Sequence, residues 1–341
     1  MAEFSTSVVD IDPSAPDHTL IAEAAAIIRA GQLVAFPTET VYGLGADGLN
    51  PTALSRIYTV KGRPPDNPLI LHLASQDQLA AVAAEVPASA SALMQAFWPG
   101  PLTLVLPKNP LVPDLATGGL TTVAVRMPDH PVAVTLIRRA GTPLAAPSAN
   151  RSGRPSPTTA QHVLDDLNGA IPLILDGGPT AIGVESTVLD VTCTPPVLLR
   201  PGGVSQEAIE VVVGALAATA EVSLHRRSPG TRYRHYSPKA RVLLLEDFSP
   251  EALQRAVAAA RSSYRRVGCL LHRLILGEAP PEVTVIRIGG CVANYARHLF
   301  AALRKLDALG ADVIIVEGVP EEGLGVAVMD RLRRAAFPPE S

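Results

Sequence analysis

Residues 33–45 read LVAFPTETVYGLG and residues 61–73 read KGRPPDNPLILHL, and these two stretches decide the fold that we predict for the first half of the chain. Each contains a short apolar run, Leu33–Phe36 in the first and Leu69–Leu73 in the second, with the length and composition of a buried strand. In an open α/β sheet, polar residues just past the strand ends line the ligand site. We therefore look for function in the polar residues that follow these strands.

A short helix is predicted between the two strands, and it ends beside two cations. Asn50 followed by Pro51 is typical of a capped helix start, and Gly62 predicts the helix end. Lys61 and Arg63 flank this glycine, in a loop where both can face an anion. A Lys-Gly-Arg sequence alone is usually a solvated helix end, but its place between two buried strands favours an anion site.

Arginines are also expected at the ends of two later strands. Val123–Val125 leads into Arg126, and Val197–Leu199 leads into Arg200. An unpaired guanidinium is costly to bury, so each arginine meets either an anionic ligand or a structural partner. The residues alone leave both possibilities open.

The strand predicted at residues 144–146 ends in small hydroxyl and amide side chains. Ser148 and Asn150 follow it, but no Gly-x-Ser-x-Gly sequence surrounds Ser148, which argues against a nucleophilic serine. A turn rich in serine and asparagine is the ordinary structural interpretation. Hydrogen bonding to phosphate or ribose is the functional interpretation that we favour.

The first half of the chain thus combines cations with neutral hydrogen-bond donors, and it has no Walker loop, paired acids or nucleophile–base couple. Such a site suits reactions that depend on positioning and charge stabilisation, above all nucleotidyl or phosphoryl transfer from ATP. Mg²⁺ is expected with ATP, held mainly by phosphates and water, and no metal site built from protein ligands is expected. The candidate residues are Lys61, Arg63, Arg126, Arg200, Thr40, Asn67, Thr122, Ser148, Asn150, Ser156 and Ser186.

At these residues the chain resembles the threonylcarbamoyl-AMP synthases, the YrdC-like family. Lys61, Arg63, Ser148 and Asn150 match the Lys-x-Arg and Ser-x-Asn signature of that family, and FPTETVYGLG at residues 36–45 is similar to its opening motif. The resemblance is close over residues 20–205. The remainder of the chain resembles the extra domain of the longer, two-domain members.

The resemblance implies an α/β fold with two domains. A YrdC-like catalytic domain, a twisted mixed sheet with helices, is expected at residues 1–218, and a smaller Rossmann-like domain with a parallel sheet at 241–341. From Val242 onward, strands alternate with helices, which independently predicts a small parallel sheet. No Gly-x-Gly-x-x-Gly follows a strand there, so we do not expect dinucleotide binding.

Residues 219–240 form a polar, basic segment between the two domains. Such a composition usually belongs to a solvated tether, but His235 and Tyr236 are more than a tether needs. In the two-domain members that this chain resembles, the segment crosses the catalytic cleft. We therefore expect a lid in which His235 and Tyr236 close over the nucleotide.

The resemblance also implies the reaction: L-threonine, bicarbonate and ATP give threonylcarbamoyl-AMP and pyrophosphate, and a downstream transferase complex then modifies a tRNA adenosine beside the anticodon. Lys61 and Arg63 are the expected catalytic residues. The expected ATP-binding residues are Lys61, Arg63, Asn67, Thr122, Ser148, Asn150, Ser156, Arg200, His235 and Tyr236. The expected threonine-binding residues are Thr40, His72, Arg126, Ala146 and Ser186.

Composition limits the alternatives. A net charge of −3 and an aromatic content of 4% argue against stable nucleic-acid binding. Three scattered cysteines, no signal-like start and no long apolar run predict a cytoplasmic protein without a membrane span. Two alternatives remain open: an RNA-binding protein without catalysis, and a carbamoyl-adenylate former that uses another acyl donor.

Overall fold

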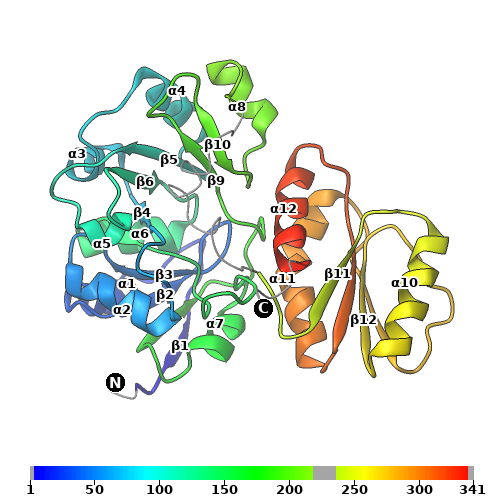
Figure 1. The fold of residues 1–341 in the computed structure, drawn as a ribbon. Helices are drawn as coiled ribbons and strands as arrows, with labels where there is room; N and C mark the ends of the chain where they lie inside the picture. Colours follow the sequence, from blue (N-terminus) through cyan, green and yellow to red (C-terminus); the bar gives the residue numbers. More distant parts are fainter. Residues whose placement is uncertain (1–3, 218–235, 337–341) are drawn as a thin grey trace. The chain divides into compact units, whose positions relative to one another are not determined.

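The computed structural model describes residues 4–217 and 236–336 (Figure 1). The chain divides into two compact units, and each is described here by itself. The first unit comprises Met1–Ser152, Ser156–Ala181 and Glu185–Arg232, and the second comprises Gly153–Pro155, Ile182–Val184 and Tyr233–Ser341.

The first unit is built on a ten-stranded sheet in the order β1-β8-β2-β3-β7-β4-β6-β5-β9-β10. The pairs β2–β3, β4–β7 and β5–β6 are antiparallel, whereas β2–β8, β4–β6 and β5–β9 are parallel. The sheet is therefore mixed, as the sequence predicted. Its strands are β1 (Ser7–Asp10), β2 (Val34–Phe36), β3 (Gly43–Asp47), β4 (Ile70–His72), β5 (Leu102–Pro107), β6 (Thr122–Arg126), β7 (Leu144–Ala145), β8 (Leu173–Asp176), β9 (Thr187–Asp190) and β10 (Val197–Arg200).

Alternate residues of the inner strands point to opposite faces of this sheet, so each face carries an apolar core. Helices cover both cores. In β2, Val34 and Phe36 join the core beneath α1 and α6, while Ala35 and the preceding Leu33 join the core on the other face. The helices are α1 (His18–Arg29), α2 (Pro51–Lys61), α3 (Leu79–Val82), α4 (Ala88–Phe97), α5 (Asp114–Thr117), α6 (Pro131–Ala140), α7 (Ala160–Leu167) and α8 (Gln206–Val213), with a 3₁₀ turn, η1, at Gln76–Gln78.

Local capping sets the ends of the two helices that frame the first strands. The Asp17 carboxylate accepts hydrogen bonds from the amides of Thr19 and Leu20 at the start of α1. The Asn50 side chain caps α2 in the same way, and Gly62 ends α2 in the left-handed conformation at φ 61°. These caps fix where Lys61 and Arg63 leave the helix.

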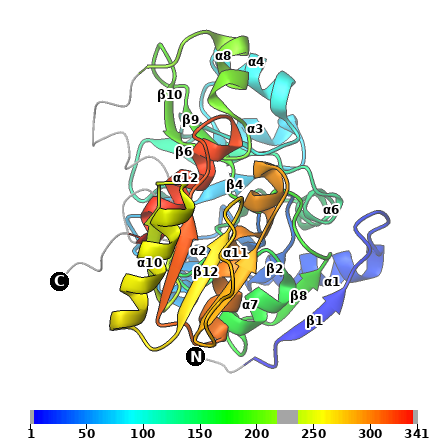
Figure 2. The same cartoon turned by 90° about the vertical axis from the view of Figure 1, so that its right-hand side faces the viewer.

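The second unit is a four-stranded, all-parallel sheet in the order β11-β14-β12-β13. Helix α10 lies on one face, and α11 and α12 lie on the other (Figures 1 and 2). This agrees with the predicted Rossmann-like parallel sheet. The elements are β11 (Arg241–Leu245), α10 (Pro250–Ser263), β12 (Val267–Leu271), β13 (Val283–Arg287), α11 (Val292–Ala308), β14 (Val313–Glu317) and α12 (Leu324–Ala336). Among the residues that the structure describes, no helix is long and apolar enough to cross a membrane.

Candidate functional site

Polar side chains form a row across one face of the first sheet. His72 of β4 pairs with Arg126 of β6, and Arg126 pairs with Thr103 of β5. Directly paired residues point to the same face of a sheet. The row continues to Ser186, whose Oγ lies 2.8 Å from Thr103 Oγ1.

Arg126 is the centre of this row, and its side chain is only 4% exposed. Its Nε donates to the Gly100 carbonyl at 3.2 Å, and its Nη1 donates to Thr40 Oγ1 at 2.9 Å. Its Nη2 lies 2.6 Å from Glu39 Oε1 as an ion pair, although neither atom makes a hydrogen bond of good geometry. The loop between β2 and β3 thus brings Glu39 and Thr40 to the end of β6.

His72 is a neutral side chain in this row. Burial, and then the positive charge of Arg126, lower its pKa to about 3, although the Ile70 and Leu144 carbonyls oppose that shift. Its Nδ1 lies 3.2 Å from the Ile70 carbonyl, which can only accept, so Nδ1 carries the proton. His72 therefore contributes an uncharged ring beside the guanidinium.

A β-bulge brings Arg200 to the same face. Leu198 of β10 pairs with Leu189 of β9, but Arg200, two positions later, pairs with Val188. The extra residue reverses the alternation, so Arg200 shares the face of Val188 and of Ser186. Its Nη2 donates to the Ser186 carbonyl at 2.9 Å and lies 3.3 Å from Ser186 Oγ.

Ala146 follows the end of β7 and continues this neighbourhood toward the Ser148 loop. Its amide donates to the Ile70 carbonyl at 3.1 Å, opposite the first residue of β4. A Cβ added to Gly43 would lie 3.2 Å from the Ala146 methyl group, so the backbone of β3 approaches closely here. The structure thus brings together the five residues expected to bind threonine, namely Thr40, His72, Arg126, Ala146 and Ser186.

A second cluster surrounds Lys61, which is 3% exposed. Its Nζ donates to the carbonyl oxygens of Ser148 and Asn150. Ser148 forms a β-bridge with Gly43, and the Ser152 amide donates to the Lys61 carbonyl at 2.8 Å. The Lys-x-Arg and Ser-x-Asn segments, far apart in sequence, therefore touch each other.

Arg63 and Asn67 form a third contact beside the start of β4. Arg63 Nη2 donates to Asn67 Oδ1 at 2.6 Å and to the Pro68 carbonyl at 2.7 Å. The Asn67 amide nitrogen is buried and finds no acceptor among the described residues. Thr122 begins β6, two residues before Ala124, which pairs with Ile70 of β4. The parallel register thus places Thr122 beside Pro68.

Three other predicted nucleotide contacts have different surroundings. Ser156 is 1% exposed, and its hydroxyl donates to Glu185 Oε1 at 2.5 Å. Tyr236 belongs to the second unit, where its ring stacks on Phe300 with centroids 5.4 Å apart and the Arg331 guanidinium lies 5.3 Å from its centroid. His235 lies outside the described residues. The predicted lid role of His235 and Tyr236 stays a prediction.

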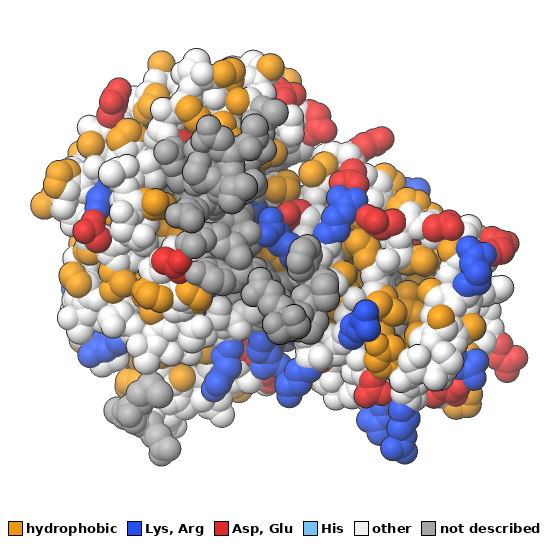
Figure 3. All heavy atoms as spheres, viewed as in Figure 1, with side chains coloured by type: hydrophobic (Ala, Val, Ile, Leu, Met, Phe, Trp, Pro, Cys, Tyr) orange, Lys and Arg blue, Asp and Glu red, His pale blue; other side chains and the backbone are white. Residues whose placement is uncertain are grey.

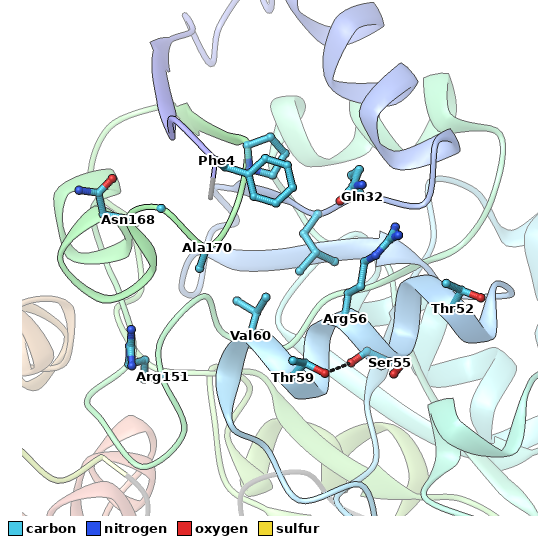
Figure 4. A pocket seen from close by; sticks show the side chains of 13 residues that line it. Phe4, Gln32, Thr52, Ser55, Arg56, Thr59, Val60, Arg151, Asn168 and Ala170 are labelled. Carbon is cyan, nitrogen blue, oxygen red and sulfur yellow. Dashed lines mark hydrogen bonds between the residues drawn. The ribbon is translucent and has the colours of Figure 1, made fainter. Parts of the chain in front are cut away.

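Figure 4 shows a cavity of about 940 Å³ in the first unit, beside one face of α2. None of the predicted site residues lines it, although Val60 precedes Lys61 and Arg151 follows Asn150. In the part of the chain that the structure describes, no group of three or more His, Cys, Asp or Glu residues could hold a metal ion.

Taken together, the first unit offers buried cations, neutral donors and a hydroxyl-rich strand face. Thr122 and Arg126 lie four residues apart on β6, which corresponds to about 13 Å along one strand. Polar groups spread over such a distance can contact an extended polyanion near Thr122 and a small carboxylate near Arg126.

Comparisons with known proteins identify the family of this chain. A family model described as "Telomere recombination" matches residues 26–202, and one described as "Threonylcarbamoyl-AMP synthase, C-terminal domain" matches residues 204–337. The threonylcarbamoyl-AMP synthase of Pyrococcus abyssi is 50% identical over 327 residues, covering 92% of this chain and 93% of the relative. That of Bacillus subtilis is 46% identical over 338 residues and covers 96% of each chain.

The chain belongs to the threonylcarbamoyl-AMP synthase family. It is therefore an enzyme of the nucleotidyltransferase type, in the two-domain form that the sequence predicted. The crystal structure of Pyrococcus abyssi Sua5 complexed with L-threonine matches with a TM-score of 0.89 and 48% identity, covering 97% of each chain. The Escherichia coli YciO structure matches 58% of this chain, with a TM-score of 0.53 and 27% identity.

Three residues of the candidate site carried no role in the sequence interpretation. Glu39 pairs with Arg126, Thr103 bridges the strand row to Ser186, and Glu185 accepts from Ser156. Glu39 lies inside the quoted opening stretch, so its position was visible, but its partner was not. Thr103 and Glu185 had no signal in the sequence, because only the register of the strands places them beside the other residues.

Proposed function

We propose that this chain joins L-threonine, bicarbonate and ATP into threonylcarbamoyl-AMP, with release of pyrophosphate. The observation that carries the proposal is the row of threonine-site candidates centred on Arg126, in a chain of this family. A relative that is 48% identical has been crystallised with L-threonine. A buried guanidinium beside small hydroxyls suits an amino acid with a carboxylate and a side-chain hydroxyl.

In this proposal Arg126 holds the carboxylate of threonine, and Thr40, His72 and Ser186 surround its other polar groups. The neutral His72 ring suits contact with a hydroxyl, because an imidazolium there would repel Arg126. Ala146 lies between this group and the Ser148 loop, where its backbone borders the junction between amino acid and nucleotide.

Lys61 and Arg63 would stabilise the triphosphate and the leaving pyrophosphate. Lys61 is already held by two carbonyl oxygens, so it needs little reorganisation to meet a phosphate. Asn67, Thr122, Ser148, Asn150, Ser156 and Arg200 are proposed to hold the rest of the nucleotide. Because Arg200 contacts Ser186, we assign it to the amino-acid end of that set.

The proposed reaction needs no nucleophilic side chain. The threonine amine combines with bicarbonate to give an N-carboxylate and water, and a carboxylate oxygen then attacks the α-phosphorus of ATP. The bond from the α-phosphorus to the bridging oxygen breaks, and pyrophosphate leaves. Positioning and charge stabilisation by this chain's cations supply the catalysis.

Mg²⁺ is proposed to arrive with ATP, bound through phosphate oxygens and water, and it would supply further charge neutralisation. The product would pass to a separate transferase complex that modifies a tRNA adenosine next to the anticodon. We propose a cytoplasmic location for this step, with no stable nucleic-acid binding by the chain itself.

The deciding experiment measures pyrophosphate release by the full chain with ATP, Mg²⁺ and bicarbonate, scanned across the amino acids. We expect release that depends on both L-threonine and bicarbonate, with mass spectrometry identifying the mixed anhydride. Salt-sensitive RNA binding without threonine-dependent release would support an RNA-binding protein instead. Release with bicarbonate and a different acyl donor would support another adenylate-forming reaction.

A further inference from the structure

Glu39 is a buried carboxylate that lacks hydrogen-bond donors. The residue is 7% exposed, and among the described residues neither carboxylate oxygen accepts a hydrogen bond of good geometry. Within residues 4–217 and 236–336, its ion pair is with Arg126 Nη2, at 2.6 Å. Buried carboxylates in native proteins are normally supplied with donors, so two oxygens without a donor indicate a place for a donor from outside the chain.

The neighbours of Glu39 define what that donor would be. The Arg126 guanidinium uses Nε on Gly100 and one Nη1 hydrogen on Thr40, which leaves its Nη2 end beside Glu39. His130 also lies near Glu39, but burial lowers the pKa of its imidazole, which favours the neutral ring. A donor from a ligand beside Arg126 would therefore meet both carboxylate oxygens, and a cationic donor suits their negative charge best.

A ligand carboxylate bound at Arg126 would strengthen the preference of Glu39 for a positively charged partner. It would bring a second negative charge close to Glu39, and two carboxylates that share one guanidinium repel each other. An α-amino acid carries its ammonium one carbon away from its carboxylate. A zwitterion at this place therefore alternates positive and negative charge, whereas a plain carboxylic acid leaves the repulsion uncompensated.

We propose that Glu39 receives the α-ammonium group of the substrate while Arg126 holds its carboxylate. The inference rests on the proposed function and adds the residue that selects amino acids against hydroxy acids. Glu39 supplies the charged acceptor for the amine before carboxylation. Selection comes both from this attraction and from repulsion of ligands that lack the positive charge.

The same geometry would also serve an orienting role, in which Glu39 positions Arg126 and does not contact the ligand. The two roles differ in one measurable respect. An orienting residue supports every ligand that uses Arg126, with or without an amine. A residue that binds the ammonium supports only ligands that carry one.

The test compares two ligands and three proteins by isothermal titration calorimetry on the full chain. The ligands are L-threonine and the hydroxy acid in which a hydroxyl replaces its amine. The proteins are wild type, Glu39→Gln and Glu39→Asp, with ATP binding and thermal unfolding as folding controls. We expect Glu39→Gln to weaken threonine binding roughly ten- to hundredfold, and to leave hydroxy-acid binding as tight or tighter because the repulsion is removed. Glu39→Asp keeps the charge and should recover part of the preference.

Equal weakening of both ligands in Glu39→Gln would overturn the inference in favour of an orienting role. Should that variant fail to fold, wild type alone still decides, because equal affinity for the two ligands would also overturn it. Threonine-dependent pyrophosphate release with no such preference would reject the role of Glu39 and leave the proposed function intact. Absence of both threonine binding and pyrophosphate release would reject the proposed function and, with it, this inference.

Discussion

Two buried glutamates, one in each unit, show how differently the same side chain can be surrounded. Glu317 at the end of β14 is 1% exposed, and its carboxylate accepts hydrogen bonds from the amides of His272, Arg273 and Leu274. Glu39 is 7% exposed and accepts none of good geometry among the described residues. Glu317 therefore serves the fold, because its charge is fully used to tie a loop to a strand end. Glu39 is left for a ligand.

Two cations, one in each unit, differ in a related way. Lys61 is held by the carbonyl oxygens of Ser148 and Asn150, and such dipoles orient a cation without cancelling its charge. Arg333, on α12, meets the carboxylates of Glu246 and Glu321 at 2.7 and 2.6 Å. The carbonyl dipoles orient the Lys61 ammonium, whereas the Arg333 guanidinium is tied to two carboxylates of its own unit. The comparison separates groups that bind from groups that stabilise.

The largest effect is expected from Glu317→Gln. An amide in place of the carboxylate turns one acceptor oxygen into a donor that faces the same backbone N–H groups, so the second unit should lose about 3 kcal/mol or more of unfolding free energy. Hydrogen exchange of the residue 267–274 segment, followed by mass spectrometry, measures this loss. Threonine binding by the same variant is the control and should persist. If hydrogen exchange of this segment in Glu317→Gln matched that of wild type, Glu317 would not stabilise the fold, and its contrast with Glu39 would be lost.

Lys61→Ala should lower pyrophosphate release by roughly 10- to 100-fold, because one charge-assisted contact contributes about 1.5–3 kcal/mol. Arg63→Lys should retain only part of the wild-type pyrophosphate release, since lysine lacks the planar guanidinium group. The matched control is Arg333→Ala, which removes a half-exposed, carboxylate-paired cation and should leave turnover within about twofold. Equal losses in Lys61→Ala and Arg333→Ala would contradict the proposed separation.

A third effect, the smallest per pH unit, concerns acid, and it tests the neutral charge state of His72. The pKa of His72 falls from 6.5 to about 3 in the folded chain, so between these values only the unfolded chain binds the proton. Stability should therefore rise with pH by up to about 1.4 kcal/mol per pH unit in this window, and be lost as pH falls through it. Urea unfolding of wild type and His72→Gln across pH 3–6.5 isolates this contribution. If the unfolding free energies of the two proteins changed with pH in parallel, the His72 ring would not be buried in its neutral form.

Features set by neighbouring residues could be predicted from the sequence. Asp17 and Asn50 cap their helices through amides two or three residues away, so α1 and α2 begin where the sequence indicates. Arg126 and Arg200 do end buried strands, as the apolar runs before them suggested.

Strand β3 was missed, because the stretch from Gly43 to Asp47 contains two glycines, which have low strand propensity. The structure gives the reason for one of them. A Cβ added to Gly45 would lie 2.6 Å from Phe36 Cε1, so the neighbouring strand requires a residue without a side chain. A contact between strands, rather than local preference, fixed this residue.

The pairing of Glu39 with Arg126 could not be predicted either. The two residues lie 87 positions apart, and only the assembled sheet brings the β2–β3 loop to the end of β6. Each candidate residue could be selected from the sequence individually, because Lys, Arg, Ser and Asn follow apolar runs that predict strands. Their mutual distances depend on strand register, which no short motif encodes.

The irregularity between Leu198 and Arg200 means that spacing, as well as residue identity, carries information in this enzyme. A regular ladder would align Leu199 with Val188 and send the guanidinium of Arg200 through to the apolar layer under the sheet. One supernumerary amino acid thus decides which side of a strand holds a positive charge. A relative that kept every named side chain but was one position shorter here would carry the same ingredients in an arrangement unable to use them.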